Sequence, residues 1–254
     1  MEMKLVDLTK ITLIIYKNAL VTSFKQTLLN WKIVGLHLGL LVVLGLSSFL
    51  IPSGNIVFGF IRGFVVTYLL SIYFASVRNI INREKTIFKD LFSEAWQIFS
   101  PLISILFALM IVNFLLRSLN APFLTIAFGI LFSVLANPLP EVIYLRGGMF
   151  MQMIENSFEF VLENFIEWFL PIFIVIGLLF SASPTVILQT FGENPLQMFE
   201  SIILLLSIIS MNIGNWGILI PALYLLLFIV LFRGNLFLAL QKGRRARLYM
   251  AKQS

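Results

Sequence analysis

Residues 137–171, NPLPEVIYLRGGMFMQMIENSFEFVLENFIEWFLP, lie between two long apolar blocks and hold five of the twelve acidic residues of the chain. Four of these five recur at every fourth position, namely Glu155, Glu159, Glu163 and Glu167. Because each step of four residues advances an α-helix by about 40°, the four carboxylates form a stripe about 120° wide. The stretch predicts an amphipathic helix that lies along a membrane face and leads into a span. Its apolar side is expected to carry Met151, Ile154, Phe158, Val161, Leu162, Phe165 and Phe169.

The composition of the chain is that of a membrane protein. Apolar residues make up 59% of the 254 residues and charged residues 12%, and the mean hydropathy is +0.99. A soluble domain carries about 25% charged residues, so much of this surface is expected to face lipid. We therefore predict an all-α, polytopic membrane protein that forms a single integral membrane domain over residues 1–254.

The residue types also exclude several kinds of site. The chain has no cysteine, which excludes disulfides, thiolate metal sites and a cysteine nucleophile. Its one histidine, His37, argues against a metal site built from histidines. No nucleophile elbow, Walker loop or zinc motif is found in the sequence. We expect no cofactor, no metal and no catalytic residue, and therefore a protein that is not an enzyme.

The uneven distribution of charge predicts the topology. Residues 141–167 hold five acidic residues and one basic residue, a net charge of −4 in a chain whose formal charge is +6. The basic residues gather at both termini and in residues 78–89, and cytoplasmic loops of membrane proteins are rich in lysine and arginine. We predict that both termini and this loop face the cytoplasm, and that the membrane is a bacterial inner membrane.

Residues 1–32 form a basic amphipathic segment. Lys10, Lys17, Lys25 and Lys32 fall within about 80° of one helical face, with apolar residues on the other faces. Helices of this type lie among the headgroups of the anionic cytoplasmic leaflet, so we predict an elbow helix that leads into the first span. The basic tail at residues 242–252 is expected to bind anionic lipid or to fix topology, and not to bind nucleic acid.

The apolar runs predict about six transmembrane helices, at residues 33–51, 56–77, 102–116, 123–136, 169–182 and 216–232. Residues 33–136 hold four of them and a cytoplasmic amphipathic helix at 86–99. Residues 137–168 are the acidic elbow, and residues 169–254 hold two spans and the tail. Residues 183–214, broken by prolines and glycines, are predicted to form an external re-entrant segment. If residues 199–211 span instead, the count is seven and the basic tail lies outside, against the charge rule.

The two elbows resemble each other in sequence. SFKQTLLNW at residues 23–31 aligns with SFEFVLENF at residues 157–165, an offset of 134 residues, and each is followed by a span of similar composition. Two interpretations stand: an internal duplication into two parallel halves, and chance convergence of apolar helix entries. Under duplication Lys25 takes the position of Glu159, so that a basic elbow faces an acidic one.

The glutamate stripe has three interpretations: a solvated helix face, a docking surface paired with basic residues, and a cation site. Like charges four residues apart oppose a helix by a few tenths of a kcal/mol per pair, which favours a compensating partner. A straight helix face does not surround an ion as a calcium loop does. The candidate docking surface therefore combines the stripe with the basic face of the first elbow or of another subunit: Glu155, Glu159, Glu163, Glu167, Lys10, Lys17, Lys25 and Lys32.

Three polar residues are predicted to lie within the spans. Arg62, about two turns from the external end of its span, either snorkels to the headgroups, bonds to another helix or contacts a substrate. His37 is interpreted as a packing residue in preference to a proton relay, and Asn113 as an interhelical hydrogen-bonding group. Arg117 and Arg233 sit at span ends and are interpreted as anchors.

The order of elements resembles two groups of membrane proteins. An elbow helix, two spans, an amphipathic cytoplasmic helix, further spans and external short helices are similar to the permease subunits of some ABC exporters. That resemblance implies that residues 86–99 are a coupling helix that docks on an ATPase, although the long acidic linker departs from the pattern. The chain also resembles uncharacterised six-span bacterial membrane proteins with an FxDLF-type helix after their second span, here FKDLF at residues 88–92.

Two hypotheses for function follow. The first is a non-catalytic scaffold or accessory subunit of a membrane assembly, which docks through its elbow helices. The second is a permease subunit that forms a path with a second copy and takes energy from a separate ATPase, because the chain has no nucleotide-binding sequence. The expected partners are the lipid bilayer, anionic lipid at the basic termini, other membrane subunits or a second copy, and an ATPase under the second hypothesis.

Overall fold

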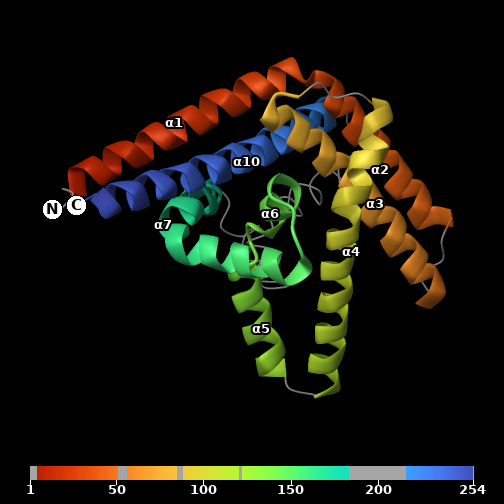
Figure 1. The fold of residues 1–254 in the computed structure, drawn as a ribbon. Helices are drawn as coiled ribbons and strands as arrows, with labels where there is room; N and C mark the ends of the chain where they lie inside the picture. Colours follow the sequence, from red (N-terminus) through yellow and green to blue (C-terminus); the bar gives the residue numbers. More distant parts are fainter. Residues whose placement is uncertain (1–4, 51–55, 85–87, 120–121, 183–215, 254) are drawn as a thin grey trace.

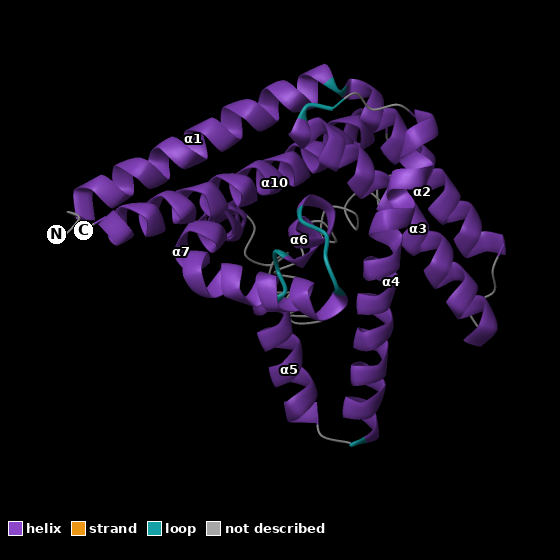
Figure 2. Ribbon diagram, viewed as in Figure 1, coloured by secondary structure: helices purple, strands orange, loops and turns teal. Residues whose placement is uncertain are grey.

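The protein is helical throughout the part of the chain that the computed structural model describes, residues 5–50, 56–84, 88–119, 122–182 and 216–253. The helices in these residues are α1 (Leu5–Leu29), α2 (Trp31–Leu50), α3 (Ile56–Asn82), α4 (Phe88–Ser118), α5 (Pro122–Leu135), α6 (Leu139–Leu145), α7 (Phe150–Ala182) and α10 (Trp216–Gln253). Figure 1 shows α1 and α10 side by side, with α2, α3, α4 and α5 extending away from them. Figure 2 shows only helices and connecting loops in the described residues, which confirms the predicted all-α fold.

Three helices of the described residues are long and apolar enough to cross a membrane. They cover Gly63–Asn82 in α3, Lys89–Leu116 in α4 and Leu219–Lys242 in α10. Phe123–Leu135 of α5 and Leu139–Leu145 meet at a bend of 44° and add a fourth if the bent pair counts as one span. The described residues therefore carry three to four candidate spans, and the re-entrant segment predicted at residues 183–214 lies outside them.

The α4–α5 hairpin has the surface expected of a helix pair that lies in lipid. In Figure 1 the two helices project together away from α1 and α10. Large apolar side chains cover their outer faces, and the most exposed are Phe114 at 70% and Phe123 at 78%. In water each such side chain would add nothing to the stability of the fold, because leaving a large apolar residue exposed forgoes about 1.5–3 kcal/mol of burial. A bilayer removes that cost, in agreement with the composition of the chain.

The cytoplasmic helix predicted at residues 86–99 is not separate from the third span. A single helix, α4, runs from Phe88 to Ser118 with Pro101 inside it, whereas the sequence predicts two elements, at residues 86–99 and 102–116, on either side of this proline. Packing explains the continuity, since buried residues recur at helical spacing on both sides of the proline. This stripe, which lies against α3, is formed by Leu91, Ala95, Ile98, Leu102 and Ile105. The two predicted elements therefore form one continuous helix.

The acidic elbow is also built differently from the prediction. Instead of one amphipathic helix, α6 is followed by a tight turn at Gly147 and Gly148, whose φ angles of 63° and 130° favour glycine. Helix α7 then contains both the acidic stripe and the predicted fifth span. The helix is kinked at Asn164, with φ −124° and ψ 26°, between Glu163 and Glu167 of the stripe. The elbow and its span are thus joined within one bent helix.

The packed face of α7 differs from the apolar face that periodicity predicts. Met151, Leu162 and Phe165 are exposed, and Leu162 reaches 75%. The face that packs against the protein instead mixes apolar and polar residues: Met153, Ser157, Phe160, Val161, Asn164, Trp168 and Phe169. The outer face of α7 therefore combines glutamates with large apolar side chains, a combination suited to a membrane interface.

The similarity between the elbows extends to the structure at two aligned pairs. Ser23 and Ser157 are fully buried in α1 and α7. Asn30 and Asn164 each donate a side-chain hydrogen bond to the carbonyl four residues earlier, at 2.8 and 3.0 Å, and each marks the point where the helix breaks. An asparagine amide that competes for a helix carbonyl favours such a break. A common origin of the halves stays a prediction, but the two breaks are built alike.

Gly234 lies at the closest approach of three helices. It belongs to α10, and a β-carbon placed there would overlap the Cδ1 atom of Ile81 in α3 and lie 2.8 Å from the hydroxyl oxygen of Tyr144 in α6. No side chain larger than glycine therefore fits unless both neighbours move. The residues on either side of Gly234 are polar, and both make long-range contacts from α10.

We predict that Gly234→Ala lowers the thermal unfolding temperature of the detergent-solubilised protein. Overpacking costs about 1–3 kcal/mol, which exceeds the roughly 1 kcal/mol that alanine gains over glycine within a helix. Ile81→Val removes the overlapping methyl group and should restore part of the loss. Gly63→Ala is the matched control, because nothing lies within 4 Å of a β-carbon at Gly63. Equal effects of the two glycine substitutions would contradict this account.

Candidate functional site

The most buried charged group of the described residues is an ion pair between α6 and α10. The Arg233 guanidinium donates two hydrogen bonds to the Glu141 carboxylate, from Nε at 2.7 Å and from Nη2 at 3.0 Å. The side chains of Arg233 and Glu141 are 9% and 1% exposed, so both charges are almost fully removed from solvent. Such a pair needs good geometry and additional hydrogen bonds to offset the cost of desolvation. The bidentate arrangement supplies that geometry.

Residues of the acidic elbow complete the surroundings of the arginine. Nη2 of Arg233 also donates to the backbone oxygen of Asn137 at 2.8 Å. The guanidinium carbon lies 4.9 Å from the ring centroid of Trp168, a cation–π contact. The indole N–H of Trp168 in turn donates to Oδ1 of Asn137 at 2.8 Å. We call Asn137, Glu141, Trp168 and Arg233 the arginine cluster, which joins α10 to α6, to α7 and to the turn before α6.

Aromatic side chains close the arginine cluster on the α7 side. Phe160 packs on Phe237 with ring centroids 4.5 Å apart and on Trp168 at 5.1 Å. Trp168 also meets Phe237 edge-on at 6.3 Å. The buried rings of Phe160 and Phe237 pack behind the Trp168 ring that covers the guanidinium, and an apolar surrounding of this kind strengthens the electrostatic attraction of the ion pair. The cluster is therefore a packed interior feature.

A second polar group lies two residues along α10. The side-chain amide of Asn235 donates to Oε1 of Gln26 at 2.7 Å, to Oγ of Ser23 at 2.9 Å and to the backbone oxygen of Leu231. The side-chain amide of Gln26 in turn donates a hydrogen bond to the backbone oxygen of Ile80 in α3 at 2.9 Å. These bonds link α1, α10 and α3, and they fix the rotation of α1 about its own axis.

A third polar contact ties the end of α3 to the start of α4. The Glu94 carboxylate accepts a hydrogen bond from the amide of Asn79 at 2.8 Å and from Arg78 at 3.4 Å. Arg78 and Glu94 are both partly exposed, so this ion pair is worth at most about 1 kcal/mol. The contact mainly sets the position of α4, because it holds the first turns of α4 against α3.

Within the described residues, the two elbows touch through a tyrosine of α1. The Tyr16 hydroxyl in α1 donates to the backbone oxygen of Glu167 in α7 at 2.6 Å. Burial, together with the nearby Glu167 carboxylate, raises the pKa of Tyr16 to about 12, so its phenol remains a neutral donor at physiological pH. Helix α1 otherwise packs mainly along α10.

The candidate docking residues are spread over two separate outward faces. Lys17, Lys25 and Lys32 are exposed on α1 and the adjoining start of α2. On α7, Glu155, Glu159 and Glu163 are exposed and Glu167 is half-buried. The contact surface formed by these faces thus stays a prediction. The side chains of Lys10, His37, Arg62 and Asn113 lie outside the described part of the structure.

Sequence reasoning misses the arginine cluster. The position of Arg233 at a span end favours an anchor, whereas the structure makes it a buried partner of Glu141. Glu141 stands out in the sequence as the acidic residue of the elbow that does not follow the four-residue repeat. Asn137 has no predicted role beyond its place in a helix stop. No local pattern connects positions 141 and 233, which are 92 residues apart.

The chemistry open to these clusters is limited by their existing bonds. Within the described residues, no group of three or more histidine, cysteine, aspartate or glutamate side chains is placed to hold a metal ion. The Arg233 guanidinium and the Asn235 amide are engaged by protein partners. The arrangement is suited to holding helices together. Comparisons with protein-family models, curated proteins and solved structures find no match.

We predict that breaking the arginine cluster from one side is more damaging than removing the ion pair altogether. Arg233→Met and Glu141→Leu should each destabilise the protein by about 3–5 kcal/mol, because each leaves a buried charge without its partner. The double variant should lose less free energy of unfolding than either single variant, because it leaves no buried charge without a partner. Thermal unfolding in one detergent measures all three, with the exposed Glu155→Gln as control. Additive losses in the double variant would show that the two residues act independently.

Proposed function

We propose that the protein is a non-catalytic polytopic membrane protein that serves as a scaffold or accessory subunit of a membrane assembly. The observation that carries this proposal is the arginine cluster. Its buried charge is bonded to Glu141 and Asn137 and covered by Trp168, so it joins helices and does not present a charge to a substrate. Groups that act on a passing substrate are expected to border a polar cavity, as intramembrane charges on substrate paths do.

The outward faces of the elbows supply the docking surfaces of this proposal. Helix α1 presents exposed lysines, and α7 presents exposed glutamates, each among large exposed apolar side chains. Both helices are held from their inner sides, α1 by Asn235 and α7 by the arginine cluster. Rigid faces of opposite charge favour specific assembly, since wrong partners meet like charge.

The topology that we propose has about six spans, with both termini in the cytoplasm of a bacterial cell. Three segments that the charge distribution assigns to the cytoplasmic side, and the acidic elbow that the count of spans places there, make mutual contacts: Gln26 with Ile80, Asn79 with Glu94, Asn235 with Gln26, and Arg233 with Glu141. Segments that lie on one side of a membrane can meet in this way without a polar contact crossing the lipid. These contacts support the proposal.

The absence of cysteine from the chain makes this topology directly testable. Ser53→Cys lies in the turn proposed to be external and Ser254→Cys in the tail proposed to be cytoplasmic. In intact cells a membrane-impermeant maleimide should label the Ser53→Cys variant, and it should label the tail variant only after permeabilisation. Ser93→Cys, at an exposed position near the start of α4, is the cytoplasmic control. Labelling of the tail in intact cells would favour seven spans.

A second candidate function, a permease subunit powered by a separate ATPase, is favoured by one observation. Phe92 and Trp96 near the start of α4 are 56% and 61% exposed, while Glu94 between them is bonded to α3. Two exposed aromatic side chains on a fixed helix are suited to insertion into a partner protein. This segment is also the one that the exporter resemblance implies to be a coupling helix.

Co-purification distinguishes the two functions. After mild detergent extraction from its own membranes, tagged protein should retain other integral membrane proteins, and charge reversal of Glu155 and Glu163 to lysine should release them. The matched variant Phe92→Ser with Trp96→Ser should leave that assembly intact. If instead an ATPase co-purifies and is lost only from the aromatic variant, the permease function replaces the scaffold. If both variants retain the same partners, the proposal that the elbows form a docking surface is wrong.

A further inference from the structure

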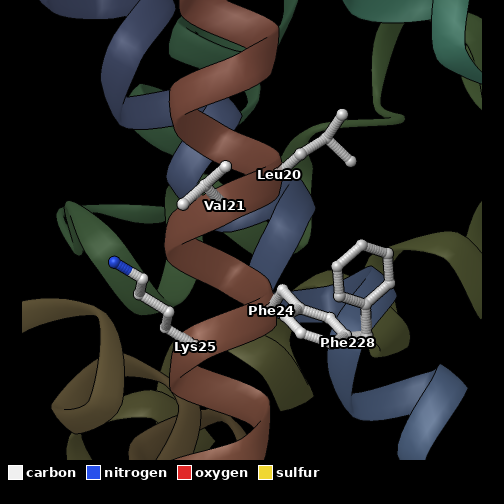
Figure 3. Close-up of a pocket in the computed structure, with 5 residues that line it drawn as sticks. All are labelled: Leu20, Val21, Phe24, Lys25 and Phe228. Carbon is white, nitrogen blue, oxygen red and sulfur yellow. The ribbon is translucent and has the colours of Figure 1, made fainter.

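A shallow apolar groove runs over the outer face of α1 and reaches α10. It has a volume of about 310 Å³ and is lined by Leu20, Val21, Phe24 and Lys25 of α1 and by Phe228 of α10 (Figure 3). Figure 3 shows the rings of Phe24 and Phe228 next to each other, with the Lys25 amine pointing away from them on the other side of α1. The groove itself is thus apolar, and the Lys25 amine stands beyond the edge opposite its aromatic side.

The groove cannot close by rotation of α1. Ser23 and Gln26, on the opposite side of the helix, are bonded to Asn235, and Ala19 and Thr27 beside them are buried. The outward apolar residues are therefore held outward, and Phe24 is 58% exposed. Such a surface on a helix beside a candidate span calls for an apolar neighbour, and lipid is the neighbour that a membrane supplies.

The charge of the two groove helices selects the kind of lipid. The sequence holds no aspartate or glutamate between residues 8 and 83, nor anywhere in α10. Lys17, Lys25 and Lys32 are all exposed, on α1 and at the start of α2. The bound molecule should therefore have one long apolar part and one negative charge, the character of an anionic phospholipid.

We propose that this groove is a discrete binding site for an anionic phospholipid. One acyl chain lies against Leu20, Phe24 and Phe228, and the headgroup phosphate pairs with the Lys25 amine. The aliphatic stem of Lys25 covers apolar surface while its amine reaches the headgroup level, as lysines at membrane interfaces do. The site shares Lys25 with the α1 docking face of the scaffold proposal, so a lipid bound there forms part of that surface.

The corresponding surface of the second elbow provides an internal comparison. The aligned residue of α7 is Glu159, within a stripe of exposed glutamates. An anionic headgroup is repelled there, although large apolar side chains such as Leu162 and Ile166 are equally exposed. The proposal therefore places the anionic lipid at the α1 groove and not at the aligned surface of α7.

The test measures lipid binding to the purified full-length protein. Native mass spectrometry in detergent, with added dioleoylphosphatidylglycerol or dioleoylphosphatidylcholine, should show tighter binding of the anionic lipid. Lys25→Gln should weaken phosphatidylglycerol binding about fivefold and leave phosphatidylcholine binding unchanged, because one lysine near an anionic surface contributes about that factor. Lys89→Gln, at an exposed lysine of α4, is the matched control and should change neither.

A second variant separates the chain contact from the charge contact. Phe24→Ser should weaken the binding of both lipids while the protein keeps its unfolding temperature, since Phe24 is exposed. The proposal is overturned if Lys25→Gln binds phosphatidylglycerol as the unmodified protein does. It is equally overturned if Phe24→Ser changes the mass of the assembly from dimer to monomer without changing lipid binding, because a second copy then covers the groove.

Discussion

The structure depends on a charge that α10 carries into the protein interior. Arg233 is buried, and an arginine is not relieved of its charge by losing a proton, so the surrounding helices must satisfy it. They do so with the Glu141 carboxylate, the Asn137 carbonyl and the Trp168 ring, which belong to α6, to the turn before α6 and to α7. The long acidic elbow, which departs from the exporter pattern in sequence, is therefore the structural partner of the last helix. A buried ion pair adds little net stability but specifies one arrangement, since any other leaves a charge unpaired.

Three consecutive residues of α10 fix the positions of the helices around it. Arg233 reaches α6 and α7, Gly234 admits α3 and α6 at van der Waals distance, and Asn235 reaches α1. Consecutive residues of a helix point about 100° apart, so a single tripeptide can face three neighbours. This is possible only because the central residue has no side chain. The helices that assemble here come from both ends and the middle of the chain, so the arrangement cannot form until most of the chain is present.

The sequence predicts the features that depend on local periodicity and fails where distant segments meet. The helical class and the membrane character follow from composition, and the paired asparagine breaks at Asn30 and Asn164 follow the predicted similarity of the elbows. Periodicity predicts the packed face of α7 only in part: Val161 and Phe169 are buried as expected, but it misses Ser157 and Asn164, polar residues that the interior accommodates through hydrogen bonds. It also separates α4 at Pro101, where packing against α3 keeps the helix continuous. The Arg233–Glu141 pair lies beyond any local pattern, since nothing in either neighbourhood identifies its partner.

The two elbows show how one construction can serve two surfaces. Each helix turns at an asparagine and buries a serine on its inner side. The exposed positions on the outer faces tolerate different side chains, so they can differ in charge between the two elbows. Lysine at position 25 and glutamate at the aligned position 159 illustrate this freedom. Under the proposed scaffold function, a basic face on one elbow and an acidic face on the other bind different partner surfaces, which would give the molecule a defined orientation in an assembly.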